Sequence, residues 1–369
     1  MLKLSPEKIE KILIIRLSAI GDVVHCLPTL RILRQKFPQA QISWAVDELT
    51  ANLLEGHPYL SQVIVIPARD LEKKLKKLST LSQSISDIKK IARQLREEKF
   101  DLVIDLHGLL KSGLVSYFTR APIRLVYPLA RDFSQFFATH RVPLISSSPH
   151  VVDKYLDTVR YLGLEIDKVE FPLGLGKKEE AFAERFFKAS GLAKEQLLLG
   201  LNPGASRLNK QWPPQKFAQL GDRLIKQYNC QIIIFGSPGD LPLVREIASQ
   251  MKSTPILAGG KTSLKELSAL ISRCDLLVSG DTGPLHLAVA AQVPVVALFG
   301  PTDYHYSGPY GEKKQVVSKQ LLCGPCFRKG DCPRKTICLK GIEVEQVMKA
   351  VKKLEPLFSP ALPFPILRP

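Results

Sequence analysis

The sequence predicts an α/β protein made of two halves of similar size, each built on a parallel sheet with helices on both faces. Three observations lead to this fold class. Short apolar runs alternate with amphipathic stretches along almost the whole chain. A segment with Pro172, Gly174 and Gly176 interrupts the alternation near the middle. The alternation then starts again, without the short tandem repeat that a solenoid would require.

The first half holds five apolar runs of the length typical of buried strands, of which KILIIR is the clearest. The expected strands are residues 11–16, 41–46, 63–66, 102–104 and 123–126. Helical spacing of apolar residues follows or separates them at residues 26–37, 85–98 and 151–162. Strands that alternate with helices in this way predict parallel pairing.

The second half begins after the break at residues 171–178 with a polar amphipathic helix at residues 179–189. Its expected strands are residues 197–201, 231–235, 275–278 and 295–299. We therefore divide the chain into an N-terminal domain, residues 1–173, and a C-terminal domain, residues 174–343. The remaining residues, 344–369, are a helix and the Pro-rich tail SPALPFPILRP, which we expect to pack back on the N-terminal domain.

Composition describes a globular protein with an excess of positive charge. The chain has 369 residues, 45% of them hydrophobic, and a formal net charge of +17. These values exclude a disordered or collagen-like chain. Nucleic acid, an acidic membrane face and a phosphorylated substrate would each suit this charge, and a merely solvated basic surface is the alternative.

Neither a secretory signal nor a membrane span is expected. A span needs roughly 18 to 20 apolar residues. The best apolar stretch, residues 285–299, is interrupted by Gln292 and Pro294. We expect a cytoplasmic protein that touches a membrane only from that side.

The first candidate site is the turn that follows the first strand, Arg16 to Asp22. Ligands of open α/β sheets bind at the carboxyl ends of the strands. Asp22 could cap the next helix or act as a general base, and the residues alone leave both roles open. Only Gly21 of the three glycines of a dinucleotide-binding turn is present, so an NAD enzyme is excluded and Asp47 is a weak ribose candidate.

The second candidate site is the loop NPGAS at residues 202–206, which continues to Lys210. Backbone N–H groups, the Ser206 hydroxyl and the Lys210 ammonium could all donate to a diphosphate. A surface turn with an exposed lysine is the alternative interpretation.

The third candidate site is SGDTGPLH at residues 279–286. A helix that begins in this turn presents free N–H groups at Thr282 and Gly283 to an anion. His286 lies one turn into the helix. A core histidine is the usual interpretation of such a residue, but the neighbouring Asp281 and Thr282 favour a functional role.

Two other motifs are weaker. GGKT at residues 259–262 resembles the end of a phosphate-binding loop, but Pro255 stands where a glycine is required. Ser263 and Glu266 form a capping box that explains the segment by helix initiation.

Four cysteines, Cys323, Cys326, Cys332 and Cys338, could hold zinc, although their spacing equally suits a loop of free thiols.

Several motifs in one order resemble the bacterial lipopolysaccharide heptosyltransferases, which use ADP-heptose. They are RLSAIGDVVHCLPTLRILR, DLVIDLHGLLKSGLVSYF, NPGASRLNKQWP, VSGDTGPLHLAVA and VPVVALFGPTD, and the cysteine segment CGPCFRKGDCP is also similar. KQWP and HVVDKYL are more similar to the enzymes that add the first heptose than to those that add the second.

The resemblance implies a GT-B architecture of two Rossmann-like domains facing a central cleft. It implies an inverting transfer of heptose from ADP-L-glycero-β-D-manno-heptose to Kdo-lipid A, with no metal and no cofactor. Asp22 would be the general base. The donor site would hold Ser206, Lys210, Asp240, Asp281, Thr282, Gly283 and His286. Asp240 stands where the family often has Glu, which puts its contact with the ribose in doubt.

On the acceptor side the resemblance implies Lys111. An acidic sugar on a phosphorylated lipid would account for the basic charge, since each Lys near an anionic membrane contributes about 1 kcal/mol. We add the hypothesis that Lys73, Lys74, Lys76 and Lys77 contact that acceptor at the inner leaflet.

The alternative enzyme is a glycosyltransferase of the same family that adds the second heptose or another sugar. A non-catalytic basic protein is the alternative class, although no nucleic-acid-binding motif is present. The oligomeric state stays open.

Overall fold

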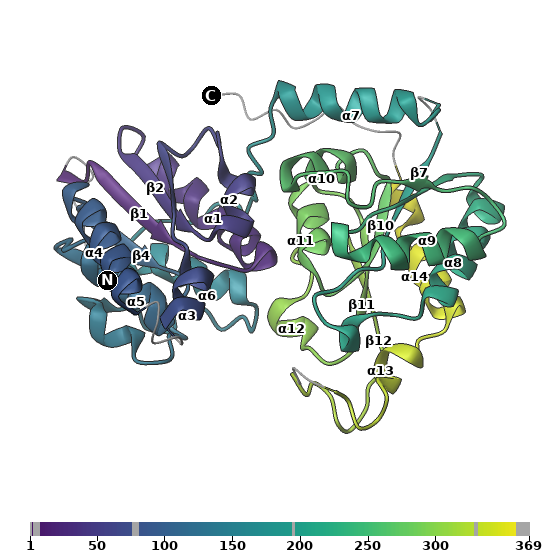
Figure 1. The fold of residues 1–369 in the computed structure, drawn as a ribbon. Coiled ribbons are helices and arrows are strands. Elements are labelled where there is room, and N and C mark those ends of the chain that lie inside the picture. Colours follow the sequence, from purple (N-terminus) through teal and green to yellow (C-terminus); the bar gives the residue numbers. More distant parts are fainter. Residues whose placement is uncertain (1, 3–7, 76–80, 194–195, 328–330, 359–369) are drawn as a thin grey trace. The chain divides into compact units, whose positions relative to one another are not determined.

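The computed structural model describes residues 2, 8–75, 81–193, 196–327 and 331–358. The described residues form two compact units that divide between Gly174 and Leu175, and these are described one at a time below (Figure 1). The division lies one residue after the boundary that we expected, within the Pro- and Gly-containing break.

The N-terminal unit contains a six-stranded, wholly parallel sheet in the order β3-β2-β1-β4-β5-β6. Its strands are β1 (Lys11–Ile15), β2 (Gln41–Val46), β3 (Gln62–Val65), β4 (Leu102–Asp105), β5 (Ile123–Val126) and β6 (His140–Arg141). Its helices are α1 (Ile20–Lys36), α2 (Glu48–Leu54), α3 (Ala68–Leu75), α4 (Leu81–Glu97), α5 (Leu110–Phe118) and α6 (Val151–Tyr161). The central strands are mostly apolar because a parallel sheet is buried on both faces, whereas the edge strand β6 is polar.

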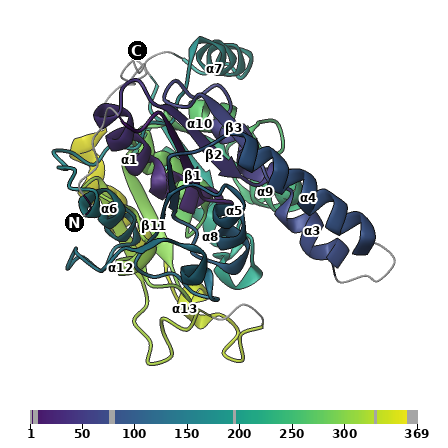
Figure 2. The same ribbon diagram turned by 90° about the vertical axis from the view of Figure 1, so that its left-hand side faces the viewer.

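Helices cover both faces of this sheet (Figure 2). Leu13, Ile15 and Leu17 point to the face that carries α4 and α5, where they pack with Leu95 and Val115. Their neighbour Arg16 points to the opposite face and lies over the ring of Tyr155 on α6. Successive side chains of a strand alternate between faces, so β1 serves two different layers. The basic segment at residues 71–90 belongs to α3 and α4 where it is described.

The C-terminal unit repeats the topology. Its sheet has the order β12-β11-β10-β7-β8-β9, again wholly parallel. The strands are β7 (Leu198–Asn202), β8 (Gln231–Ile234), β9 (Ile256–Leu257), β10 (Leu276–Gly280), β11 (Val295–Phe299) and β12 (Lys314–Ser318). The helices are α7 (Lys177–Ala189), α8 (Pro214–Tyr228), α9 (Leu241–Gln250), α10 (Leu264–Ile271), α11 (Gly283–Ala290), α12 (Tyr304–Ser307), α13 (Ile337–Lys340) and α14 (Val344–Leu354). Counted within each unit, both sheets run 3-2-1-4-5-6, the Rossmann order.

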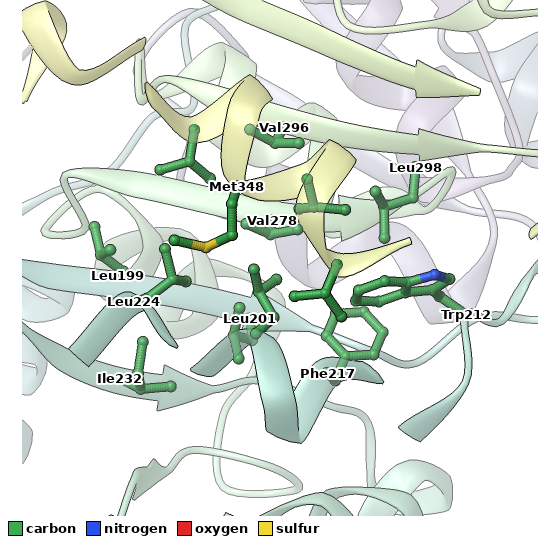
Figure 3. Close-up of a cluster of buried hydrophobic side chains, with 14 of the residues drawn as sticks. Leu199, Leu201, Trp212, Phe217, Leu224, Ile232, Val278, Val296, Leu298 and Met348 are labelled. Carbon is green, nitrogen blue, oxygen red and sulfur yellow. The ribbon is translucent and has the colours of Figure 1, made fainter. Parts of the chain in front are cut away.

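The core of the C-terminal unit gathers apolar side chains from the sheet, α8 and α14 (Figure 3). Trp212 is buried against Phe217 with ring centroids 5.0 Å apart, and its Nε1 donates to Ile342 O at 3.0 Å. Val347, Met348 and Val351 of α14 enter the same core. We had expected this helix to pack back on the N-terminal domain. Its apolar face packs within its own unit instead, and the tail 359–369 lies outside the described residues.

None of the described helices combines the length and the apolar character needed to cross a bilayer.

At residues 259–266 the capping box that we predicted is present. Ser263 Oγ accepts from Glu266 N at 3.3 Å, and Glu266 Oε2 accepts from Ser263 N at 2.8 Å. Helix initiation therefore explains this segment.

Candidate active site

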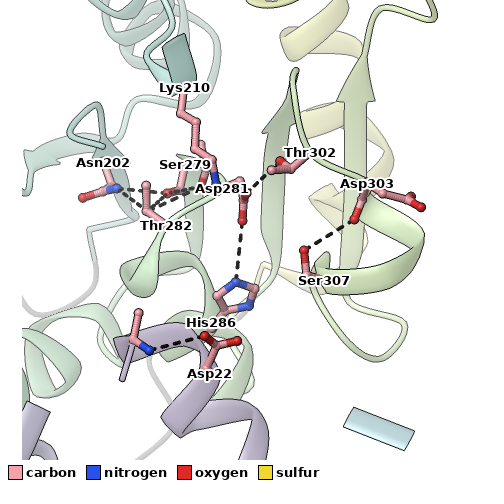
Figure 4. Close-up of polar contacts among 12 residues, drawn as sticks. Asp22, Asn202, Lys210, Ser279, Asp281, Thr282, His286, Thr302, Asp303 and Ser307 are labelled. Carbon is pink, nitrogen blue, oxygen red and sulfur yellow. Dashed lines mark hydrogen bonds and ion pairs between the residues drawn. The ribbon is translucent and has the colours of Figure 1, made fainter. Parts of the chain in front are cut away.

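The C-terminal unit gathers polar side chains where β7 and β10 end, at the switch point of its sheet (Figure 4). Asn202 is the last residue of β7 and pairs in register with Ser279. The Asn202 Nδ2 donates to Ser279 Oγ and to Thr282 Oγ1, both at 3.0 Å. Asn202 and Ser279 are buried, so this amide holds the turn after β10 from the neighbouring strand.

Lys210 and Asp281 form the charged centre of this cluster. Lys210 Nζ lies 2.5 Å from Asp281 Oδ2, and Thr302 Oγ1 donates to the same oxygen at 2.7 Å. The His286 Nε2 is 3.9 Å from Asp281 Oδ1. Both charged side chains are mostly buried, at 16% and 12% exposure. Low exposure strengthens their attraction, so Asp281 fixes the direction of the lysine ammonium.

Helix α11 begins beside this ion pair. Thr282 is its N-cap but makes no side-chain capping bond to the helix, and Pro284 occupies the first turn. The first amides of a helix lack intrahelical acceptors and carry the positive end of its dipole. Gly280 is needed close by, because a Cβ there would lie 3.2 Å from Lys210 O. The turn can accept an anion on Thr282 and Gly283 next to Lys210.

Asp240 and Ser206 lie at the neighbouring loops. Asp240 Oδ2 accepts from Ser237 N at 2.9 Å and from Ser237 Oγ at 2.6 Å. It also lies against Gly204, where a Cβ would come within 2.5 Å of that oxygen. Ser206 is exposed in a separate groove beside Arg207 and Gln211. The described contacts do not join Ser206 to Lys210 and Asp281.

In the N-terminal unit, Asp22 stands in the first turn of α1 and is 37% exposed. Its Oδ2 accepts from Ala19 N at 3.3 Å and lies 2.6 Å from a guanidinium nitrogen of Arg16. Arg16 is 8% exposed and donates to Leu106 O at 2.7 Å. Burial alone would lower the pKa of Arg16, but the Asp22 carboxylate, together with Tyr155 and Cys26, outweighs burial and raises that pKa. Asp22 is therefore oriented by a charged, buried partner while part of it faces solvent.

Sequence reasoning missed the turn after β4. Asp105 is buried, and it accepts from His107 N, Gly108 N and Ser112 Oγ, each at 2.9 Å. Burial raises the pKa of Asp105 to about 6 despite these hydrogen bonds. Burial, with Arg16 and Lys111 nearby, lowers the pKa of His107 to about 2, so its imidazole is neutral. The signal that could have found these residues is DLHG at a strand end next to β1.

The lysines expected on the acceptor side differ in their surroundings. Lys111 is half-buried in the first turn of α5. Lys74 Nζ lies 2.7 Å from Asp70 and 3.2 Å from Asp87, and so links α3 to α4. Lys73 is exposed. Lys76 and Lys77 lie outside the described residues.

The four late cysteines line one small cavity with Gly300 and Lys319. Cys323 and Cys326 are exposed, and Cys332 and Cys338 are partly buried. Within the described parts of the chain, no three or more His, Cys, Asp or Glu side chains are grouped so as to hold a metal ion. None of the cysteines is in a disulfide.

Relatives of known function match most of the chain. It is 28% identical to the lipopolysaccharide core heptosyltransferase OpsX of Haemophilus influenzae over 83% of each chain. It is also 28% identical to lipopolysaccharide heptosyltransferase 1 of Pseudomonas aeruginosa, over 94% of this chain and 93% of that one. Lipopolysaccharide heptosyltransferase 2 of Escherichia coli is 27% identical over 87% of this chain and 91% of its own length.

Solved structures share the fold. A glycosyl transferase family 9 protein from Veillonella parvula has a TM-score of 0.81 at 27% identity, covering 96% of this chain and 98% of its own. The E. coli heptosyltransferase WaaC, solved with ADP, has a TM-score of 0.73 at 22% identity and covers 93% of this chain and 99% of its own. The predicted α/β fold of GT-B type is thereby confirmed.

The family model named glycosyltransferase family 9 (heptosyltransferase) matches residues 88–337, more than half of the chain. The match covers β4 to β12 and includes the turn at the start of α11. The resemblance seen in the sequence motifs is confirmed, and the chain belongs to glycosyltransferase family 9, a family of transferase enzymes.

Proposed function

We propose that this glycosyltransferase moves heptose from ADP-L-glycero-β-D-manno-heptose to a Kdo residue of Kdo-lipid A, in the lipopolysaccharide inner core. The observation that carries the proposal is the uncapped start of α11 beside Lys210. A diphosphate is the ligand that such an N-terminus and a lysine bind best. The relatives named for lipopolysaccharide heptose transfer, and the structural neighbour solved with ADP, support this donor and acceptor.

On the donor side, we assign the diphosphate to Lys210 and to the amides of Thr282 and Gly283. Asp281, whose carboxylate accepts from Thr302, holds the Lys210 ammonium in place before the donor arrives. His286 lies near the same carboxylate. We place the nucleoside near Asp240 and Gly204, and Ser206 at the edge of the donor site. Negative charge develops on the leaving ADP, and donors fixed in advance stabilise it without reorganisation.

On the acceptor side, Asp22 is the general base. It takes the proton of the Kdo hydroxyl while that oxygen bonds to the anomeric carbon of the heptose. The bond between that carbon and the phosphate oxygen breaks, and ADP leaves from the opposite side with inversion. Arg16 orients the carboxylate through the 2.6 Å contact. A positioned base contributes roughly 10² to 10⁴-fold.

We further propose that the enzyme works at the cytoplasmic face of the inner membrane as a peripheral protein. The formal net charge of +17 supports attraction to an anionic surface. Lys111, Lys73 and Lys74, with Lys76 and Lys77, are the acceptor-side candidates. Lys73 is the best placed among those described because it is exposed, whereas Lys74 is held between two carboxylates.

The test measures ADP release from ADP-heptose with Kdo-lipid A for the wild type and for Asp22→Asn. We expect the variant to bind ADP normally and to lose at least about 10²-fold in kcat. Asp167→Asn, at an exposed aspartate of the same domain, is the matched control and should keep full activity. Full activity of Asp22→Asn would exclude the base role, and a wild type that binds ADP but ignores this pair would exclude the proposed substrates.

A second candidate is addition of the second heptose. Relatives named heptosyltransferase 1 and heptosyltransferase 2 match at nearly the same identity, 28% and 27%. The same assay with heptosyl-Kdo-lipid A distinguishes the two steps. A non-catalytic basic protein would instead show no turnover, and its Tm would rise with random DNA rather than with ADP.

A further inference from the structure

The N-terminal domain contains an apolar cavity of about 460 Å³ that the proposed reaction does not use. It lies between α3, α4, α5 and the loops that follow β1 and β3. Apolar side chains dominate its wall, among them Leu17, Ile66, Leu71, Ile88, Ile91 and Leu114. Its charged members are Glu72, Lys111 and Asp132.

The size of this cavity indicates a ligand. Protein interiors are close-packed and contain few voids larger than a water molecule. Binding sites for small molecules span about 300 to 1,000 Å³ and have mostly apolar walls with a few polar groups. An apolar wall with a single lysine favours a hydrocarbon that carries an anionic group.

The cavity adjoins the turn that holds the proposed base. Leu17 lines the cavity, and the preceding residue, Arg16, binds Asp22 from the other face of β1. Lys111 lines the cavity in the first turn of α5. His107, in the turn after β4, is near both Arg16 and Lys111, whose charges help to lower the pKa of its imidazole. A molecule with its tail in the cavity would therefore have its head along the edge of β1 and β4 that leads to Asp22.

Charge selects the head group of that molecule. Among the described residues Lys111 has no carboxylate within ion-pair distance, so its ammonium is available to an anion. Glu72 and Asp132 are exposed at the rim, where water solvates them. We propose that the cavity holds one acyl chain of the anionic lipid acceptor while Lys111 meets a phosphate or carboxylate of its head. This inference rests on the proposed function for the identity of the lipid, but not for the existence of the site.

Direct binding tests the cavity without catalysis. The probe is decyl phosphate, below its micelle concentration, titrated calorimetrically into the full-length protein. We expect 1:1 binding that strengthens about fourfold for each methylene added from octyl to decyl phosphate. Ile91→Trp fills the cavity and should weaken binding at least tenfold. Ile85→Trp is the matched control on the same helix, because Ile85 is 45% exposed and does not line the cavity.

Several results would overturn the proposal. One is that decyl phosphate fails to bind the wild type. Another is that the wild type and Ile91→Trp bind it with equal affinity. A third is that Ile85→Trp loses as much affinity as Ile91→Trp does. Leu114→Phe fills the cavity from α5 and replaces Ile91→Trp if the latter does not fold, as judged by thermal unfolding. Lys111→Met should weaken the binding of decyl phosphate but leave the binding of decanol unchanged. An equal loss of affinity for both ligands would exclude the proposed head-group contact.

Kinetics with two acceptors then identify the lipid. Ile91→Trp should raise the KM for acylated Kdo-lipid A at least tenfold and leave the KM for the fully deacylated acceptor unchanged. Equal changes for both acceptors would exclude the acceptor's acyl chain as the occupant. Decyl phosphate binding without any heptose transfer would refute the proposed function but not the cavity site. Heptose transfer without binding of decyl phosphate would refute the cavity site but not the proposed function.

Discussion

The two domains share one sheet topology but treat the turn after their fourth strand in opposite ways. In the N-terminal domain, Asp105 pairs in register with the last residue of β1. In the C-terminal domain, Ser279 occupies the matching position opposite Asn202, the last residue of β7. The Asp105 carboxylate accepts the amides of His107 and Gly108. These two amides lie in the loop before α5, and the carboxylate of their own turn therefore satisfies them.

In the C-terminal domain no carboxylate fills the turn. Ser279 presents only a hydroxyl, and the nearby Asp281 is turned to Lys210 and Thr302. The start of α11 therefore keeps its partial positive charge for a ligand. From this difference we infer that the residue at one strand end decides whether the loop amides bind a carboxylate of the chain itself or stay available to an anionic ligand. Four predictions test it, from the largest expected effect to the smallest.

The first prediction places a carboxylate in the open turn. Ser279→Asp should weaken ADP binding at least about 10²-fold, because like charges brought together cost several kcal/mol. Ser279→Asn has the same size without the charge and should lose much less. Calorimetric titration with ADP measures both. Equal losses in the two variants would mean that space, rather than charge, decides binding at this turn.

The second prediction concerns the cation of the same site. Lys210→Met should weaken ADP binding about 10- to 100-fold, since a hydrogen bond to a charged group contributes about 1.5–3 kcal/mol. It also leaves Asp281, which is 12% exposed, without its ammonium partner, while Thr302 still donates to it and His286 stays nearby. Lys226→Met, at an exposed lysine on α8 of the same domain, is the control. Unchanged ADP affinity in Lys210→Met would remove this lysine from the donor site.

The third prediction concerns the filled turn and pH. The folded-state pKa of Asp105, about 6, lies above the unfolded value of about 3.9. Its contribution to stability is therefore complete below about pH 4 and is lost as the pH rises to about 6. Between pH 4 and 7, the free energy of unfolding of the wild type should fall by up to about 3 kcal/mol relative to Asp105→Asn.

Urea denaturation of both proteins across this pH range measures the difference. Asn is a close control because its Oδ1 can still accept from the amides of His107 and Gly108. Parallel pH profiles would show that Asp105 titrates normally in the folded protein.

The fourth and smallest effect separates the acceptor side from the donor side. Lys73→Ser should raise the KM for Kdo-lipid A by up to about fivefold, since one lysine near an anionic surface contributes about 1 kcal/mol. The KM for ADP-heptose should not change. Steady-state kinetics measure both constants, and Lys74→Ser is the comparison because Lys74 is already paired with Asp70 and Asp87. If Lys73→Ser changed only the KM for ADP-heptose, the assignment of Lys73 to the acceptor side would be wrong.

Local patterns predicted most of the fold because buried parallel strands are apolar on both faces. Nine expected strands are present within two residues of their predicted ends. The three that we missed, β6, β9 and β12, lie at or next to sheet edges, and two of them have only two residues. Helix α1 begins at Ile20, six residues before the predicted helix, and its first turns already bury Val23 and Val24.

The candidate site residues also differ in how far the sequence alone could indicate them. SGDTGPLH and Asp22 could be read from the sequence because each stands in a local strand–turn–helix pattern. Asp105 and His107 stand in a similar pattern, DLHG after a strand, but the sequence does not show that the Asp105 carboxylate is buried and accepts the amides of its own turn. For Asp22, capping and ligand-facing roles proved compatible, because its Oδ2 meets Ala19 N and Arg16 while the residue stays partly exposed.

The sequence by itself determined the two α/β halves, the break between them and the family, because these depend on the spacing of apolar residues and on contiguous motifs. Only the tertiary structure decided which distant side chains meet. Asn202 reaches Thr282 across 80 residues, and Arg16 reaches Leu106 across 90. It also decided that α14 joins the core of its own unit and that α3, α4 and α5 line an open apolar cavity. Strand order and helix packing create these contacts, and neither is encoded in any short stretch of the chain.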